Sequence, residues 1–473
     1  MKIRAWRNVR LLQPVGILVL VAAVLALAPS AVHATPGFAR QTGISCQACH
    51  TVFPELTPFG RKFKLNAYVF TNVKQLEPIN EQSQRTLALS EFPPLSVQLQ
   101  ASNTSLKKAI PDTGAPAVTD LSQKDSTEFP HALSLFYTGK VSDNLGAFLQ
   151  LTWNPSGNSV GIDNSDLRFA DHGILPSIGM TDFIYGLTLN NNPTSQDVWN
   201  STPAWGYPFI GTNVGVPPVS KALLDGSLAQ QSVGFGGYLY LINHLYLEIS
   251  GYRSAQTSFT NATTGGPGPL DSTSGSARIR GPAAPYWRAA WEQDWGSHSL
   301  SFGTYGISAS THPPGIGESG PTNTFTDIAV DAQYQYISDD HVFSAFTTFI
   351  HELRTFNNVT LAANHRDTLN TERITGTYFY RRKVGGSVQV FSTTGTRDRV
   401  LYGAGTGVLG TASGSPDTQG AVFELDYLPW LNTKLGLQYT AYTKFNGRSH
   451  NYDDFTRNAS DNNTVFVYLW TAF

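Results

Sequence analysis

The sequence has few cysteines, few charges and no long apolar run after Ala28, and each shortage excludes a class of protein. Two cysteines among 473 residues leave no second pair for a four-ligand zinc site. Lysine and arginine number 32 against 34 aspartate and glutamate, so no basic excess indicates a nucleic-acid partner. Only 14% of residues are charged, which is low for a soluble protein of this size. No transmembrane helix is expected beyond the N-terminus.

Residues 1–34 have the pattern of a bacterial export signal. The apolar run 15–28 is too short to span a membrane comfortably, and Val32-His33-Ala34 fits a cleavage site between small residues. Cleavage would leave Thr35 as the mature N-terminus, and an uncleaved N-terminal anchor is the alternative. The positive charges that precede the apolar run are Lys2, Arg4, Arg7 and Arg10.

The two cysteines belong to one motif, Cys46-Gln47-Ala48-Cys49-His50, which is the attachment signature of a c-type haem. Two thiols add across the porphyrin vinyl groups, and the adjacent imidazole becomes an axial ligand of the iron. A thioredoxin-like redox pair would need a βαβ context, and a disulfide across two residues is strained. We therefore predict one covalently bound haem c, attached to Cys46 and Cys49 and ligated by His50.

Residues 35–91 are predicted to form a small c-type cytochrome segment. A unit of this length can hardly form its own hydrophobic core, so we expect it to be docked in or at the lumen of the structure that follows. Helices here should be short because prolines interrupt them. The aromatic residues that could cover a haem face are Phe63, Tyr68 and Phe70.

Residues 92–473 are predicted to form an all-β transmembrane barrel of about 16 antiparallel strands. Segments of about ten residues alternate between apolar and polar side chains, and short turns alternate with long loops such as 191–231, 253–284 and 395–418. The chain ends on Phe473, like the signal that bacterial outer-membrane insertion machinery reads. The predicted strands begin near residues 94, 131, 144, 164, 179, 232, 243, 285, 297, 324, 341, 371, 385, 419, 433 and 464.

This pattern places the protein in the bacterial outer membrane, with its apolar strand faces against lipid. A soluble β-sandwich or a β-rich secreted enzyme is the alternative, because strands of those proteins also alternate. Carboxylates should face the lumen, and four are expected near the outer mouth, where they could bind iron. The alternative is ordinary lumen polarity, with Arg288, Arg373 and Arg381 as partners. The four mouth carboxylates are Asp327, Asp331, Glu424 and Asp426.

The second axial ligand of the iron stays open at this point. Met180 is the one methionine of the mature chain, and alternation along its strand points it into the lumen near a short turn. A thioether ligand would raise the reduction potential, so Met180 is the candidate second ligand. A methionine that merely packs is the alternative, and the haem could be five-coordinate. Other candidates are the Thr35 amine, Lys62, Lys64, His131, His172 and His351.

Two stretches of the chain resemble the fused cytochrome–porin iron oxidases of iron-oxidising bacteria. The first runs from Phe38 through the haem motif to Leu56-Thr57-Pro58-Phe59-Gly60-Arg61-Lys62-Phe63-Lys64. The second runs from Gly186-Leu187-Thr188-Leu189 through Trp199-Asn200 to Pro203-Ala204-Trp205-Gly206. The rest of the barrel is similar only in pattern.

The resemblance implies an Fe(II):cytochrome c oxidoreductase. One haem would take an electron from Fe(II) at the cell surface and pass it to a periplasmic c-type cytochrome or copper protein. Two other functions stay open: an outward conduit that reduces external acceptors, and a porin plugged by its haem segment. Whether the haem segment fills the lumen should separate an electron conduit from an open porin.

Overall fold

The computed structural model of this chain describes residues 37–70, 94–110, 124–154, 159–175, 180–254, 278–281, 283–313, 320–357, 362–403 and 410–473. The predicted signal peptide 1–34 and the predicted domain boundary after residue 91 lie outside these residues. None of the described helices is long and apolar enough to cross a membrane.

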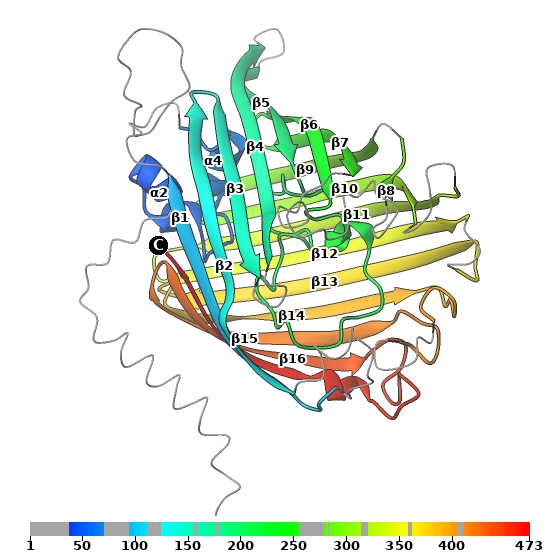
Figure 1. Cartoon of the computed structure of the whole chain (residues 1–473). Helices are drawn as coiled ribbons and strands as arrows, with labels where there is room; N and C mark the ends of the chain where they lie inside the picture. The colour runs from blue at the N-terminus through cyan, green and yellow to red at the C-terminus, as the bar shows by residue number, and fades with distance from the viewer. Residues whose placement is uncertain are drawn as a thin grey trace, which may run out of the picture.

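Sixteen antiparallel strands close into a barrel, which confirms the predicted fold class (Figure 1). Closure is made by β1, which pairs with β2 on one side and with β17 on the other. The two-residue strand β8 (Arg278–Ile279) pairs with β10 beyond the end of β9 and is not counted among the sixteen. The strands are β1 (Leu95–Leu106), β2 (Asp125–Ser142), β3 (Leu145–Asn154), β4 (Ser159–Leu175), β5 (Met180–Asn190), β6 (Ser232–Leu241), β7 (Leu245–Ser254), β9 (Ala284–Trp295), β10 (His298–His312), β11 (Asn323–Ile337), β12 (His341–Phe356), β13 (Arg366–Tyr380), β14 (Val384–Gly395), β15 (Thr418–Trp430), β16 (Thr433–Lys444) and β17 (Thr464–Ala472).

The predicted strand starts agree with these bounds, with three larger differences. Strands β2, β4 and β13 begin five or six residues earlier than predicted, at Asp125, Ser159 and Arg366. The extra residues lie at the outer ends of the strands, where polar sequences resemble loops and the apolar alternation is weak. The barrel wall therefore extends further on the outer side than the alternation alone indicated.

Side chains alternate between an apolar outer face and a polar lumen. On β11, Ile328 and Val330 are 48% and 53% exposed on the outer face, whereas Asp327 and Gln335 are fully buried inside. A closed barrel pairs every backbone group and leaves no strand edge, so it can cross the hydrocarbon core of a bilayer. With this apolar exterior the chain is a porin-like β-barrel protein of the bacterial outer membrane.

The two ends of the barrel differ in the length of their connections. One end has turns of two or three residues, such as 143–144, 296–297 and 381–383, and this is the periplasmic end of an outer-membrane barrel. The C-terminus lies at the same end, as do α2 (Gly37–Thr42) and α4 (Pro58–Leu65) (Figure 1). The N-terminal segment 37–70 is therefore seated at the periplasmic mouth.

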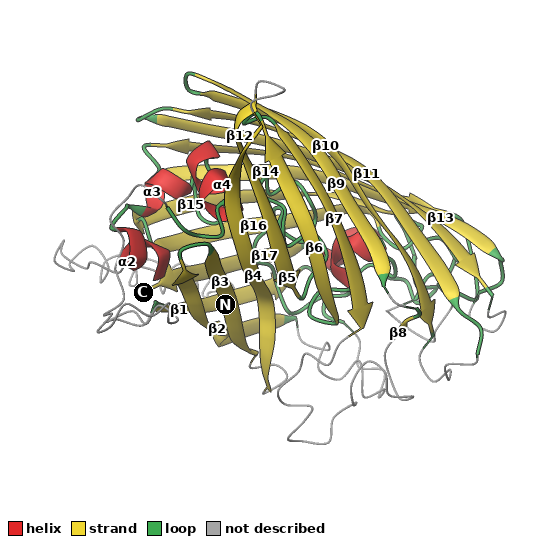
Figure 2. Ribbon diagram, turned by 90° about the horizontal axis from the view of Figure 1, so that it is seen from above, coloured by secondary structure: helices red, strands yellow, loops and turns green. Residues whose placement is uncertain are grey.

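Two separate parts of the chain fill the lumen, one after the other along the barrel. Segment 37–70 occupies the periplasmic part, with α3 (Cys46–Cys49) and α4 inside the ring of strands (Figure 2). Residues 191–231, expected as an external loop, instead fold back into the middle and outer lumen, where η2 (Leu223–Ser227) contacts β11. A further short helix, η3 (Ala459–Asn462), lies against β16.

Candidate functional site

The haem-motif residues form a tight turn that is held against α4. The backbone N–H of His50 donates to the Cys46 carbonyl at 2.9 Å and closes the one turn of α3. The backbone N–H of Thr57 donates to the Cys49 carbonyl at 2.9 Å, and its hydroxyl donates to the Ala48 carbonyl. These bonds fix the two cysteines and the histidine relative to the start of the next helix.

Helix α4 begins at a capped N-terminus and packs directly on the motif. The Thr57 hydroxyl accepts from the Gly60 backbone N–H at 3.1 Å, and Pro58 occupies the first helical turn, where its missing N–H is harmless. A Cβ built on Gly60 would lie 2.2 Å from the Cys49 carbonyl oxygen. Gly60 is therefore required for the helix to approach the backbone of the motif this closely.

His50 is held as a neutral base. Its Nδ1 lies 3.2 Å from the Pro54 carbonyl oxygen, which can only accept, so Nδ1 carries the proton and the lone pair is left on Nε2. Burial lowers the pKa of His50 to about 4. A neutral imidazole oriented through Nδ1–H is the form that ligates a metal through Nε2.

The two cysteines form no disulfide with each other. Burial raises the pKa of both thiols, and for Cys49 it reaches about 11. A reactive redox pair needs the thiolate, which a raised pKa disfavours. The geometry therefore does not support the disulfide or the thioredoxin-like alternative.

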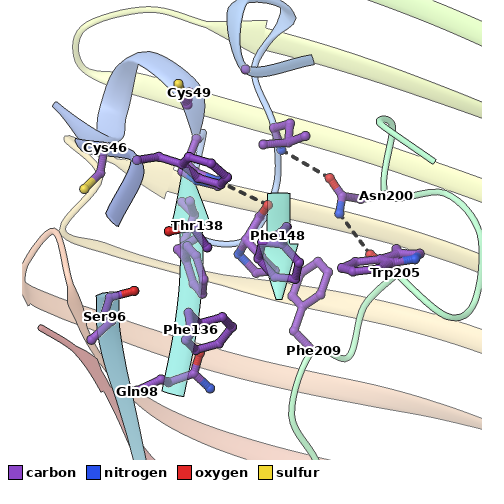
Figure 3. Close-up of a pocket in the computed structure, with 18 of the residues that line it drawn as sticks. Cys46, Cys49, Ser96, Gln98, Phe136, Thr138, Phe148, Asn200, Trp205 and Phe209 are labelled. Carbon is purple, nitrogen blue, oxygen red and sulfur yellow. Dashed lines mark hydrogen bonds between the residues drawn. The ribbon is translucent and has the colours of Figure 1, made fainter. Parts of the chain in front are cut away.

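A cavity of about 530 Å³ lies beside the motif, inside the periplasmic part of the barrel. Figure 3 shows Cys46 and Cys49 at one side of it, above Phe136 and Phe148 of β2 and β3, which line the same cavity. Trp205, from the loop that folds into the lumen, forms part of the opposite wall. A cavity of this size is within the range of small-molecule and cofactor sites.

The aromatic residues expected around a haem are near this cavity. Phe63 and Tyr68 line it, together with Phe38. Phe38 stacks on Tyr68 with ring centroids 5.0 Å apart, and Phe70 packs against Phe63 at 4.5 Å. Segment 37–70 thus forms a small aromatic cluster whose remaining apolar surface faces the cavity.

Arg61 anchors the segment to the barrel wall. Its guanidinium lies 2.7 Å from Glu292 of β9 and donates to Gln335 of β11 at 2.7 Å. It also donates to Ser299 of β10 at 2.6 Å, and its side chain is almost completely buried. A buried arginine that bonds three adjacent strands ties α4 to one position in the lumen.

The two stretches that carry the family resemblance meet at the cavity. The backbone N–H of Leu56 donates to the Asn200 side-chain oxygen at 3.2 Å, and Asn200 donates in turn to the Trp205 carbonyl at 3.0 Å (Figure 3). Lys64 donates to the Ser195 carbonyl at 2.6 Å. Residues more than 130 positions apart in the chain therefore build one site.

Met180, the candidate second axial ligand, is the first residue of β5 and pairs with Leu175 of β4. Its side chain lies outside the described residues, so its role stays a prediction. The Thr35 amine also lies outside them. Among the lysines considered, Lys64 lines the cavity and Lys62 does not.

The three histidines considered as second ligands do not line the cavity. His131 has Nδ1 2.6 Å from Glu128, and His172 has Nδ1 2.8 Å from Asp182. His351 lies on the outer face of β12 and contacts Asn370 at 2.6 Å. Each imidazole already has a polar partner away from the motif.

The four carboxylates expected near the outer mouth are all buried inside the barrel. Glu424 is instead the central residue of β15 and Asp426 lies two residues nearer its periplasmic end, and Lys434 Nζ is 3.0 and 3.6 Å from their oxygens. Asp331 pairs with Arg288 at 2.6 Å, as ordinary lumen polarity predicts. The placement at the outer mouth was therefore wrong for Glu424 and Asp426.

Within the described residues no group of three or more acidic, histidine or cysteine side chains could hold a metal ion.

Sequence reasoning did not assign site roles to Gly60, Asn200, Trp205 and Arg382. The first three lie in the two resembling stretches, so the resemblance was the signal that could have found them. Arg382 lies in the turn between β13 and β14, where it donates to the Gln47 carbonyl at 2.9 Å and lines the cavity. No sequence pattern identifies a turn residue whose side chain contacts the backbone of the haem motif.

No known protein family and no curated protein matches this chain. Several solved outer-membrane proteins are similar to this chain at low identity. The channel DcaP of Acinetobacter baumannii has a TM-score of 0.45 and 13% identity over 80% of this chain and 96% of its own. OmpT of Vibrio cholerae has a TM-score of 0.41 and 12% identity over 80% and 98%. OmpF of Salmonella typhi has a TM-score of 0.41 and 10% identity over 80% and 97%. Likeness at this level carries no information about activity.

Proposed function

We propose that this protein is an outer-membrane c-type cytochrome that oxidises extracellular Fe(II) and passes the electron to a periplasmic cytochrome or copper protein. The observation that carries the proposal is the placement of the motif. The only two cysteines of the chain, both unbridged, and the neutral His50 adjoin one cavity inside the barrel. The choice of Fe(II) as donor rests on the resemblance.

The residues present fit one haem c. Two thiols without a disulfide are free to form thioethers, and His50 Nε2 has the lone pair that an iron ligand needs. The cavity beside them is large, and most of its exposed surface is apolar, with polar side chains interspersed. The haem would supply a one-electron carrier. Cys46 and Cys49 would hold it covalently, and His50 would ligate its iron.

The rest of the site holds the group in place and limits water. Thr57 and Gly60 fix the motif to α4, and Arg61 fixes α4 to the wall. The aromatic cluster around Phe63 and Tyr68 covers one side of the cavity. Such a shell sets solvent access and dielectric constant, which are two of the levers by which a protein sets a reduction potential.

The filled lumen favours electron transfer over solute transport. Segment 37–70 blocks the periplasmic part, and the loop 191–231 blocks the middle, where Trp199 and Gln196 are almost completely buried. An electron can pass through packed protein, whereas a solute needs an open path. A barrel also lets poorly soluble Fe(III) form outside a membrane whose hydrocarbon core is about 30 Å thick.

Two other functions would use the same haem motif. An outward conduit that reduces external acceptors would need the same motif and the same filled lumen. A haem-plugged porin would share the motif, and its segment 37–70 would have to leave the lumen to open it. The bonds of Arg61 to three strands oppose such a movement.

The test uses purified, haem-loaded protein in detergent. The protein is reduced, reoxidised and mixed with Fe(II) in a stopped-flow spectrometer at the growth pH. Prompt re-reduction of the haem bands is expected, and the double variant Cys46→Ser, Cys49→Ser should carry no covalent haem. A haem that Fe(II) fails to reduce, with a potential well below the iron couple, would remove Fe(II) as donor and favour the outward conduit.

A further inference from the structure

Three cationic side chains line the cavity, and the contacts of two of them already assign them a role within the protein. Lys434 Nζ lies 3.0 Å from Glu424 and 3.6 Å from Asp426, so its charge is neutralised within the barrel wall. Arg382 donates to the carbonyl oxygens of Gln47 and His50 at 2.9 and 3.4 Å. Its role is to hold the backbone of the haem motif.

Lys64 differs from the other two. Its ammonium donates to the carbonyls of Ser195 and Asp197 at 2.6 and 3.1 Å, and it lies 4.9 Å from the centre of the Trp205 ring. Among the described residues no carboxylate lies within the 4.0 Å of an ion pair with Lys64. An ammonium has three N–H donors, so these two carbonyls leave one donor.

A cation in this setting needs an anion. Carbonyl dipoles and an aromatic face stabilise an ammonium without neutralising it. The charges of Asp166, Asp197 and Glu248 act on Lys64 from beyond ion-pair distance, and they do not outweigh the effect of its burial. Removing such a charge from water is costly unless it is paired, and burial lowers the pKa of Lys64 to about 8. The carbonyls, the Trp205 ring and the helix hold the ammonium at the cavity wall before any anion arrives.

We infer that Lys64 is the counter-ion for a carboxylate of the group held in the cavity. This inference rests on the proposed function, because a haem carries two propionate carboxylates. A fixed positive charge beside a one-electron carrier favours its reduced form, since the added electron is attracted to it. Lys64 is thus a positioning residue that also raises the reduction potential, as suits an acceptor of electrons from Fe(II).

A simpler interpretation of these contacts is that Lys64 only holds the loop 191–231 in place through the carbonyls of Ser195 and Asp197. That role would affect loading of the haem but not the environment of its carboxylates. The neighbouring Lys62 provides a matched control, because it lies on the same helix, carries the same charge and does not line the cavity.

The test compares Lys64→Gln, Lys64→Arg and Lys62→Gln with the wild type, all haem-loaded in detergent. Resonance Raman spectra report the propionate-bending band, and an optical titration reports the midpoint potential. Lys64→Gln should move the band and lower the one-electron equilibrium constant at least tenfold, which is about 59 mV. Lys64→Arg should keep the wild-type values, and so should Lys62→Gln.

A second measurement covers the case in which Lys64→Gln loads no haem. Acetylation of Lys64 by an amine-reactive reagent is compared in haem-loaded wild type and in the haem-free Cys46→Ser, Cys49→Ser variant. At least tenfold slower labelling of Lys64 in the loaded protein is expected. Equal labelling would overturn the inference, as would an unchanged band and potential in loaded Lys64→Gln.

Two further outcomes would point to a different cause. Protection of Lys64 by added acetate in the haem-free variant, without protection in the loaded protein, would assign the site to a free anion and overturn the inference. Wild-type protein without covalent haem would overturn the proposed function itself, before Lys64 is tested.

Discussion

The two halves of the lumen are filled in different ways. In the outer half, charged wall residues bind the infolded loop directly: Asp327 and Glu352 accept from the backbone N–H groups of Leu224 and Leu223, both at 2.7 Å. In the periplasmic half, segment 37–70 is bound as firmly at Arg61 but leaves a cavity of about 530 Å³ beside Cys46 and Cys49.

The outer half is filled by a loop that bonds to the wall, whereas the periplasmic half leaves a cavity beside the haem motif. A polar lumen filled by a polar loop needs buried donors and acceptors to find partners, and the backbone N–H groups of Leu223 and Leu224 show such pairing. The periplasmic half instead places two thiols and an imidazole beside a cavity that has the dimensions of a cofactor site. The cavity is therefore the part of the lumen where a bound group is expected.

Replacing Gly60 with alanine should break the periplasmic half most severely. The new Cβ would lie 2.2 Å from the Cys49 carbonyl oxygen, so α4 or the motif must shift. Overpacking of this kind costs about 1–3 kcal/mol, and we expect a several-fold lower yield of haem-loaded protein, measured by pyridine haemochrome per barrel. Gly376→Ala is the control, since its Cβ would meet no atom within 4 Å. Equal yields for the two variants would show that the helix does not need this close approach.

Replacing Arg373 with alanine should loosen the outer half. Arg373 binds both oxygens of Asp225 at 2.7 and 2.8 Å and holds η2 to the wall, close to Lys221. Trypsin cleavage after Lys221 in intact cells should then become several-fold faster. Arg381→Ala is the control, because its ion pair with Asp340 is exposed at a periplasmic turn and is worth little. Wild-type cleavage in Arg373→Ala would mean that this pair does not hold the loop.

The smallest expected effect is a pH dependence in the periplasmic half. Burial lowers the pKa of Lys64 to about 8, so the ammonium is charged below that pH and loses its proton above it. Because the cation favours the reduced state and a paired carboxylate raises its pKa, the midpoint potential of the loaded protein should fall as pH rises through a value above about 8. Potentiometric titrations from pH 6 to pH 10 would measure this step. The step should vanish in Lys64→Gln and persist in Lys62→Gln, and its persistence in Lys64→Gln would assign it to another group.

Much of the fold could be predicted because a barrel strand has a simple period. On β11 the alternation of Ile328 and Val330 with Asp327 and Asp331 already separates lipid from lumen. The spacing of Cys46, Cys49 and His50 is local in the chain, so the motif could be identified from the sequence, and the bound haem stays a prediction.

The remaining parts depend on contacts that no local pattern encodes. The loop 191–231 has the composition of an external loop, and it is held in the lumen by bonds to distant strands, such as those of Trp199 to Glu292 of β9 and Gln333 of β11. Asp426 was placed by strand direction alone, and its pairing with Lys434 across a hairpin was not visible in that way.

The central claim is that an electron crosses this filled barrel through the haem motif. Proteoliposomes with ferricytochrome c inside and Fe(II) outside test it most directly, with outward-facing loops verified by cleavage with added protease. Wild-type protein should reduce the trapped cytochrome while the vesicles stay tight to small solutes, and the Cys46→Ser, Cys49→Ser variant should not. Reduction by the double variant, or passage of small solutes through the wild type, would contradict the account.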